Sequence, residues 1–211
     1  QSGRRLFQAA NKLKAAGKRL FVLLGSRSAL GERAAASHTG RLTGRARLER
    51  ILIEDAGATV VEDPDELWQS ARFCSRWGPA SPTSQIGIFT ISGGLAVLTA
   101  DQLGLAGGFG LPEPGPEVAE ALREFLPEYL RPANPLDLGP GTMPHGFSPA
   151  LLTFAKESRY DVIAVVLPVV ATAWQPTITQ NLVDAAETIG KPLVVCWHAG
   201  DSVTDSVRAL R

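Results

Sequence analysis

A single histidine, His38, lies in the segment 34–40, where its neighbours are small or carry hydroxyl groups. Small neighbours would let a bulky ligand reach the imidazole ring. Arg27 precedes the segment and glycines flank it, so positive charge and a closely approaching backbone are available to an anion. A neutral imidazole is a competent nucleophile toward phosphorus near pH 7. The segment therefore predicts phosphate chemistry on nitrogen. The alternative is an ordinary loop histidine near a helix start, with Ser37 or Thr39 as the N-cap.

A second chemical signal is the turn Ser92-Gly93-Gly94, which follows an apolar run and precedes a helical pattern. Such a junction leaves backbone N–H groups free at the start of a helix, and these groups bind anions. In an open parallel sheet it would lie at the carboxyl edge of the strands, where ligands bind. The alternative is a turn that serves only packing and capping.

Asn134 and Asp137 flank a proline and form a third polar motif. Asn and Asp side chains bond to their own backbone, so a rigid corner is the plain interpretation. His145 and His198 have no carboxylate or cysteine partner at metal-ligand spacing, so no metal site is assigned. The chain has no phosphate loop, and residues 107–110 lack the spacing of a dinucleotide fingerprint. We therefore do not expect this chain to be the main binding site of a nucleotide.

The composition is that of a globular protein, with 211 residues of which 45% are hydrophobic and 20% are charged. Lys plus Arg equals Asp plus Glu at 21 each, which argues against nucleic acid or a membrane surface as a partner. Cys74 and Cys196 show neither zinc nor redox spacing and suit reduced thiols. No signal peptide and no apolar run of about 20 residues is present, so we expect a cytoplasmic protein.

Strand and helix patterns alternate along the chain, which predicts the α/β class. In the first part the pattern predicts a helix at 6–16 closed by Gly17 and then a strand at 20–24 buried on both faces. A helix at 42–57 and a strand at 59–61 follow. The last helix of this part begins at Pro64 with Asp63 as its N-cap. His38 would fall in the loop or helix start after the first strand. Trp68 and Phe73 are expected to be packing residues.

A Pro, Gly and Ser-rich stretch at 79–84 predicts a linker between domains at 1–78 and 85–211. The pattern then predicts strands at 86–91, 161–167 and 192–197 and helices at 95–104, 116–126 and 176–189. The irregular segments 104–116 and 131–149 could line a site. Both ends of the chain interrupt helical patterns, so we expect a fragment whose second domain is truncated at its C-terminus.

Taken in order, these motifs resemble the alpha part of the ADP-forming acyl-CoA synthetases, relatives of succinyl-CoA synthetase, over nearly the whole chain. The specific match is Ser37-His38-Thr39-Gly40, and residues 25–28, 92–94 and 134–137 also fit. The resemblance implies two flavodoxin-like three-layer αβα domains with mostly parallel sheets. The first would be incomplete, with residues 1–78 forming the C-terminal part of the phosphohistidine domain.

The resemblance also implies a function, namely an acid–CoA ligase in which acid, CoA and ATP give acyl-CoA, ADP and phosphate. His38 would be the residue that is transiently phosphorylated, and Asn134 and Asp137 would support the loop. The residues implied to bind phosphate are Ser37, Thr39, Gly40, Ser92, Gly93 and Gly94. The fragment alone is expected to be inactive.

The cofactors implied are CoA and ATP or ADP with Mg²⁺, held mainly by a CoA-binding domain and an ATP-grasp domain or subunit that this chain lacks. The substrate would be a small carboxylic acid or its acyl-CoA, and we expect no cofactor to bind tightly to this chain. A homo-oligomer is left open. The chain departs from the family at Leu24, at Leu95-Ala96 and in the glycine-rich residues 104–115, where the family has a short strand. The competing hypothesis is therefore a non-catalytic regulatory CoA-ligase-like module of a protein acyltransferase.

Overall fold

A computed structural model describes residues 2–39, 46–78, 81, 83–143 and 145–210. Its contacts divide the chain into two compact units, Gln1–Ala80 and Ser81–Arg211. Residues 79, 80 and 82 of the predicted linker lie outside the described residues.

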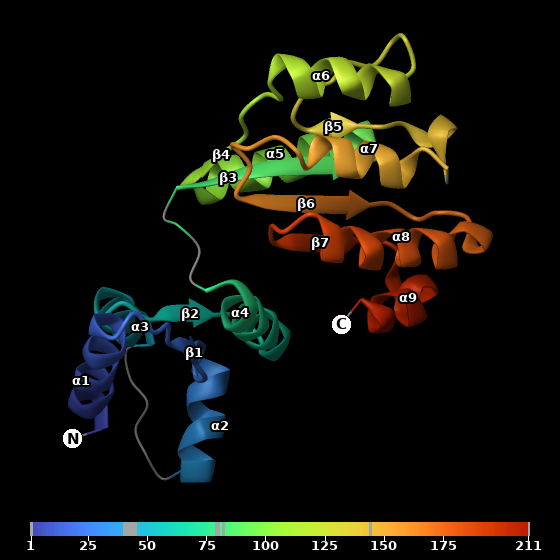
Figure 1. Cartoon of the computed structure of the whole chain (residues 1–211). Coiled ribbons are helices and arrows are strands. Elements are labelled where there is room, and N and C mark those ends of the chain that lie inside the picture. Colours follow the sequence, from blue (N-terminus) through green and yellow to red (C-terminus); the bar gives the residue numbers. More distant parts are fainter. Residues whose placement is uncertain (1, 40–45, 79–80, 82, 144, 211) are drawn as a thin grey trace. The chain divides into compact units, whose positions relative to one another are not determined.

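The first unit is built around two short parallel strands (Figure 1). Its elements are α1 (Ser2–Ala15), β1 (Phe21–Leu23), α2 (Ala29–Thr39), α3 (Ala46–Asp55), β2 (Thr59–Val61) and α4 (Pro64–Trp77). Phe21 pairs with Thr59 and Leu23 with Val61. α4 packs against both strands, α3 packs against β2, and α1 lies against α3.

Two helix ends in this unit confirm the sequence predictions. Gly17 takes a positive φ of 67°, and the next residue, Lys18, donates its N–H to the Leu13 carbonyl at 2.9 Å, which closes α1. The Asp63 carboxylate caps α4 by accepting the Glu66 N–H at 2.8 Å, and Pro64 occupies the first turn.

Two expectations about burial in this unit are wrong. The strand predicted to be buried on both faces is only three residues long, and Leu23 is 39% exposed. Within the described part of the chain β1 pairs with β2 alone, so its other edge and much of its surface are uncovered. Trp68 is 70% exposed on α4 and does not act as a packing residue there, while Phe73 is half-buried.

The second unit contains a five-stranded parallel sheet in the order β4-β3-β6-β7, with β5 also paired to β3. Its elements are β3 (Ser84–Thr90), α5 (Gly93–Ala106), β4 (Phe109–Gly110), α6 (Pro116–Leu122), β5 (Leu136–Asp137), α7 (Phe147–Phe154), β6 (Val162–Leu167), α8 (Gln175–Thr188), β7 (Leu193–Trp197) and α9 (Thr204–Ala209), with short 3-10 turns at 123–125, 140–142, 172–174 and 200–203.

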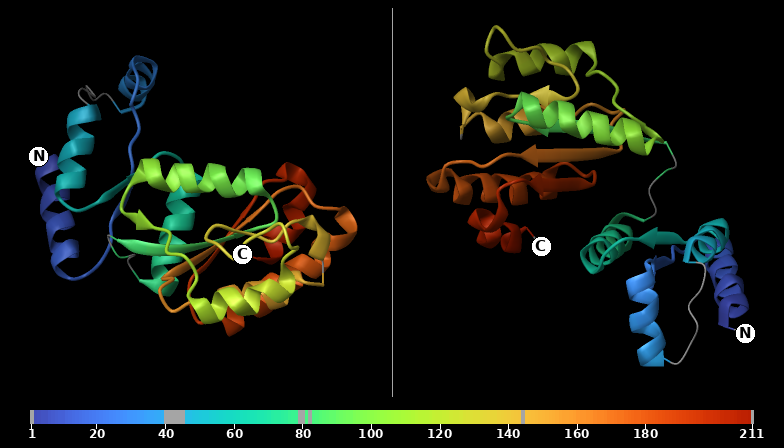
Figure 2. Two further views of the ribbon diagram at one scale, coloured as in Figure 1. Left: turned by 90° about the horizontal axis from the view of Figure 1, so that it is seen from above. Right: turned by 180° about the vertical axis from the view of Figure 1, so that it is seen from behind.

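Helices cover both faces of this sheet. α5 lies on one face, and α7 and α8 lie on the other (Figure 2, left; α5 green, α7 and α8 orange). The core on the α7 and α8 side contains Phe89, Phe147 and Phe154, all fully buried. The Phe89 and Phe147 rings meet edge to face with centroids 5.3 Å apart. The apolar strand runs therefore fold as strands covered on both faces.

The segments predicted to be irregular contain three regular elements, which corrects the sequence prediction. β4 and β5 are two residues each, too short to give a periodic pattern. α7 begins at Phe147 and contains Pro149, which resembles a loop signal but is tolerated in the first turn of a helix. The helix predicted at 116–126 ends at Leu122 and continues as a 3-10 turn.

Candidate functional site

His38 lies in the last turn of α2, not in a loop or at a helix start, which corrects the sequence prediction. α2 begins after Ser28, whose hydroxyl oxygen accepts the Gly31 N–H at 3.2 Å. The alanines at 34–36 continue the helix because alanine has the highest helix propensity. The end of a helix presents carbonyl groups rather than N–H groups. The dipole of α2 therefore gives no support to a phosphate on His38.

The other residues of this motif are only partly described. The Ser37 hydroxyl donates to the Ala34 carbonyl at 2.7 Å, so Ser37 does not cap a helix start as expected. The side chains of His38 and Thr39, and the whole of Gly40, lie outside the described residues.

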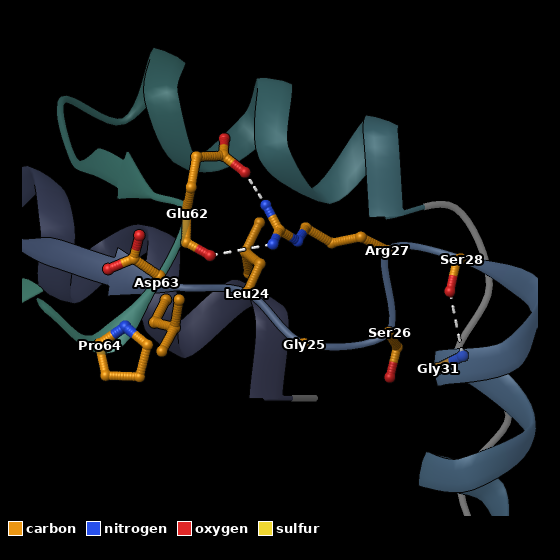
Figure 3. Close-up of a pocket in the computed structure, with 10 residues that line it drawn as sticks. Leu24, Gly25, Ser26, Arg27, Ser28, Gly31, Glu62, Asp63 and Pro64 are labelled. Atoms are coloured by element: carbon orange, nitrogen blue, oxygen red, sulfur yellow. Dashed lines mark hydrogen bonds and ion pairs between the residues drawn. The ribbon is translucent and has the colours of Figure 1, made fainter. Parts of the chain in front are cut away.

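The amino end of α2 borders a hollow of about 680 Å³ at the carboxyl ends of β1 and β2 (Figure 3). The loop before α2 and the junction between β2 and α4 line it, through residues Leu23, Leu24, Gly25, Ser26, Arg27, Ser28, Gly31, Glu62, Asp63 and Pro64. This is the edge at which ligands bind in open parallel sheets.

Arg27, expected to supply positive charge, is engaged within this hollow. Its guanidinium forms an ion pair with the Glu62 carboxylate and donates to the Glu62 carbonyl oxygen at 2.9 Å (Figure 3). Arg50 donates to the same carboxylate at 2.5 Å and to Glu54 at 2.9 Å. The charge of Arg27 is thus already compensated. No local sequence pattern predicts this pairing, because Glu62 lies 35 residues along the chain from Arg27.

The turn after β3 opens a helix as predicted. Ser92 has an extended backbone, with φ −144°, and its hydroxyl oxygen accepts the Leu95 N–H at 3.4 Å. Gly93 and Gly94 are exposed, and their N–H groups have no partner among the described residues. Two free N–H groups at the amino end of a fourteen-residue helix, at the carboxyl edge of a parallel sheet, can bind an anion.

Asp137 stands beside this helix end. The pairing of β5 with β3 places Asp137 opposite Thr90, two residues before Ser92. One carboxylate oxygen, Oδ1, accepts the Gly139 N–H at 2.9 Å. The other, Oδ2, lies 3.1 Å from the position that a Cβ atom on Gly93 would take. A fixed negative charge therefore borders the free N–H groups.

Asn134, expected to support the loop, is bonded to the sheet. Asn134 is 6% exposed. Its side-chain oxygen accepts the Ile88 N–H at 2.9 Å. Its side-chain nitrogen donates to the carbonyls of Ile86 at 2.8 Å and Pro112 at 3.0 Å. β4 and β5 pair with the two ends of β3, and the Asn134 side-chain amide hydrogen-bonds the backbone groups of β3 between those two ends. The corner predicted from the sequence thus also ties the loop to β3.

A buried carboxylate, Glu157, was not singled out by the sequence. It is 5% exposed and accepts the Gly115 N–H at 2.5 Å and the Arg159 Nε at 2.8 Å. The hydrogen bonds from Arg159 lower the pKa of Glu157 to about 2. Arg159 also donates to the Glu113 carbonyl at 2.5 Å. Lys191 donates to the Ala155 carbonyl at 3.1 Å and also to the carbonyl of Glu157. This cluster joins loops of the second unit.

In the part of the chain that the structure describes, no group of three His, Cys, Asp or Glu side chains could hold a metal ion. The helices described are all too short or too polar to cross a bilayer.

Comparison with known proteins relates both units to one group of enzymes. Residues 1–74 match the succinyl-CoA ligase-like flavodoxin domain family. The chain is 29% identical over 214 residues to an ADP-forming acetate–CoA ligase I of Archaeoglobus fulgidus, which covers 100% of this chain and 29% of that protein. It is 28% identical over 204 residues to the alpha subunit of the ADP-forming acetate–CoA ligase II of Pyrococcus furiosus, with 95% and 44% covered. The chain thus spans less than half the length of these relatives.

Solved structures agree. A dinucleotide-forming acetyl-coenzyme A synthetase 1 of Ca. Korarchaeum cryptofilum, in complex with phosphate and ADP, superposes with a TM-score of 0.81 at 25% identity, over 99% of this chain and 45% of that one. A protein of Pyrococcus horikoshii with a TM-score of 0.78 and 20% identity shows the same fold. The chain has a flavodoxin-like α/β fold with parallel sheets, and its first part matches a succinyl-CoA ligase-like domain. Along its whole length it is similar to ADP-forming acetate–CoA ligases, as its motifs predicted.

Proposed function

We propose that this chain is part of an ADP-forming acyl-CoA synthetase and carries the histidine that is transiently phosphorylated, His38. The reaction interconverts a small carboxylic acid, CoA and ATP with acyl-CoA, ADP and phosphate. The observation that carries the proposal is the match to an ADP-forming acetate–CoA ligase, which runs through both units and covers 100% of the chain.

In the direction of ATP synthesis, phosphate displaces CoA from the acyl-CoA and gives an acyl phosphate. A neutral nitrogen of His38 then attacks phosphorus, so that an N–P bond forms while the P–O bond to the departing carboxylate breaks. Transfer of the phosphoryl group from His38 to ADP completes the reaction.

The amino end of α5 is the part of the chain suited to phosphate oxygens. The N–H groups of Gly93 and Gly94 would donate to these oxygens, and the Ser92 cap fixes the direction of the helix start. His38 ends α2 rather than beginning a helix, so α2 offers no free N–H groups to a phosphate on this histidine.

The nucleotide, its Mg²⁺ and CoA are assigned to other domains or subunits. Bound Mg²⁺ would neutralise phosphate charge on the nucleotide. The described residues form no cluster for this metal, so its ligands would come from an ATP-grasp domain or subunit. A CoA-binding domain would complete the enzyme.

Labelling tests this proposal. The complete protein, as wild type, His38→Ala and His145→Ala, is incubated with Mg²⁺ and ATP labelled in its γ-phosphate. We expect acid-labile, base-stable label on the wild type and on the control His145→Ala, whose exposed histidine lies in a loop, and none on His38→Ala. Absence of label from the wild type would favour a regulatory module, and equal labelling of His38→Ala would rule out His38 as the acceptor.

A further inference from the structure

Trp68 is 70% exposed on the outer face of α4, although tryptophan is highly buried on average in folded proteins. We propose that this face of α4 pairs with the same face of a second copy of the chain, with the two helices antiparallel. Association of this kind is independent of the proposed function.

The outer face of α4 follows from the helical repeat. Exposed residues recur along it at spacings of four, three and four positions, namely Asp65, Gln69, Arg72 and Arg76. This is the spacing of a coiled-coil seam, so these side chains form one stripe, the α4 stripe. Trp68 borders it. The half-buried residues of α4 lie on the opposite side, where the helix packs against β1 and β2.

The charges of the α4 stripe differ between its two ends. Asp65 lies in the first turn of α4 and Arg76 in its last turn. In an antiparallel pair of helices the first turn of each copy meets the last turn of the other, so Asp65 lies opposite Arg76 at both ends of the pair. A parallel pair would bring like charges together at both ends. The α4 stripe is therefore complementary to itself in one orientation only.

Trp68 supplies the apolar part of this surface. Tryptophan and arginine are the residues most enriched among those that dominate binding at protein interfaces. In the antiparallel pair, Trp68 of each copy borders the contact, where it loses exposure and can stack on a guanidinium group of the second copy.

The size of the face sets the strength of the association. α4 has fourteen residues, so its outer face buries less than the roughly 800 Å² per partner of a standard interface. We therefore expect a weak dimer, with a Kd of about 10 to 100 µM.

A role within one chain makes a different prediction. An acidic residue in the first turn and a basic residue in the last turn also suit the dipole of α4. In that case reversing either charge would lower the stability of the chain, and the chain would sediment as a monomer at every concentration. The dependence of mass on concentration therefore separates the two roles.

The test is sedimentation equilibrium of the 211-residue chain at concentrations from about 5 to about 500 µM, which bracket the expected Kd. The variants are Asp65→Arg, Arg76→Asp, the double variant that carries both reversals, and Trp68→Ala. Asp101→Arg, on an exposed position of α5, makes the same change in net charge as Asp65→Arg and serves as the control. Circular dichroism shows whether each variant is folded.

We expect the wild type and Asp101→Arg to dimerise equally. Each single reversal turns two attractions into two repulsions in the dimer, so it should raise the Kd about tenfold. The double variant restores opposite charges and should return to within about threefold of the wild-type Kd. Trp68→Ala should also raise the Kd about tenfold or more.

Several results would overturn the inference. They are a wild type that is monomeric throughout the range, a folded single reversal with an unchanged Kd, and a folded double variant that dimerises as weakly as the single reversals. Trp68→Ala decides the question if the double variant does not fold, because a Kd equal to that of the wild type would show that the chains associate through another surface.

Discussion

At the scale of single residues, buried polar side chains join segments that the sequence places far apart. Asn134 binds backbone groups of Ile86 and Ile88, and Glu157 binds the Gly115 N–H from 42 residues away. Each satisfies groups that would otherwise be costly to bury. Residues of this kind hold the loops of the second unit in place.

The charge of Glu157 should make stability depend on pH. Its pKa is lowered to about 2 in the folded protein, so the stabilisation is complete above the ordinary value of 4.5 and is lost as pH falls toward 2. We expect Glu157→Gln to reduce the free energy of unfolding by about 1 to 3 kcal/mol at pH 7. The difference in unfolding free energy from wild type, measured by urea denaturation, should shrink as the pH falls from about 5 to about 2.

The matched control is Glu120→Gln, an exposed residue paired with Arg123. Exposed pairs of this kind contribute little, so its cost should stay below about 0.5 kcal/mol. A cost for Glu157→Gln that is unchanged across the same pH range would mean that the ionised carboxylate does not contribute as described.

At the scale of elements, the start of α5 should be more sensitive at Gly93 than at Gly94. A Cβ on Gly93 would lie 3.1 Å from Asp137 Oδ2, whereas one on Gly94 would lie 3.9 Å from Ser92 Oγ. Both valine variants carry the same helix propensity. We expect Gly93→Val to be about 1 to 2 kcal/mol less stable than Gly94→Val in chemical denaturation. Equal stability would show that the carboxylate moves aside freely.

The amino end of α2 is the second element-scale feature, because the helix extends away from the two strands (Figure 1) and Leu30 on it is 69% exposed. Glu62 binds Arg27 just before the helix. We expect Glu62→Gln to raise hydrogen exchange of the amides at 31–37 by about two- to fivefold. Glu54→Gln, which leaves the Arg27 pairing intact, should not. The same exchange rates in both variants would argue against a role for Glu62 in holding α2.

How far the sequence predicts these elements depends on the type of signal. Apolar runs and capping residues predict β2, β6 and α4, because burial and the Asp63 cap act locally. The end of α2 is missed because hydroxyl and glycine residues at 37–40 resemble a helix start, while the preceding alanines extend the helix. The Glu62 and Glu157 contacts are missed because pairing across the fold leaves no periodic pattern.

At the scale of the whole molecule, the two units have very different cores. All residues of the large apolar cluster lie in the second unit. The buried apolar residues described in the first unit are small, namely Ala10, Ala56, Ala58, Val60 and Val61. Burial of apolar area is the main source of stability, so the first unit should be the weaker one.

We therefore expect the chain to unfold in two steps. Amides of β1 and β2 should exchange at lower denaturant concentration than those of β3 and β6, as measured by hydrogen exchange with mass spectrometry. A core substitution in the second unit, Phe147→Ala, should shift only the later step, by about 3 to 5 kcal/mol. A single transition shared by all four strands would contradict this description.

The position of Asn134 has one more consequence, which concerns association between molecules. The open edge of a strand is a template on which another chain can add. Between β4 and β5 the Asn134 amide already occupies the bonding groups at Ile86 and Ile88. An incoming strand therefore has no free backbone N–H or carbonyl group to bond along that stretch. The side chain that anchors the loop also protects this strand edge from aggregation.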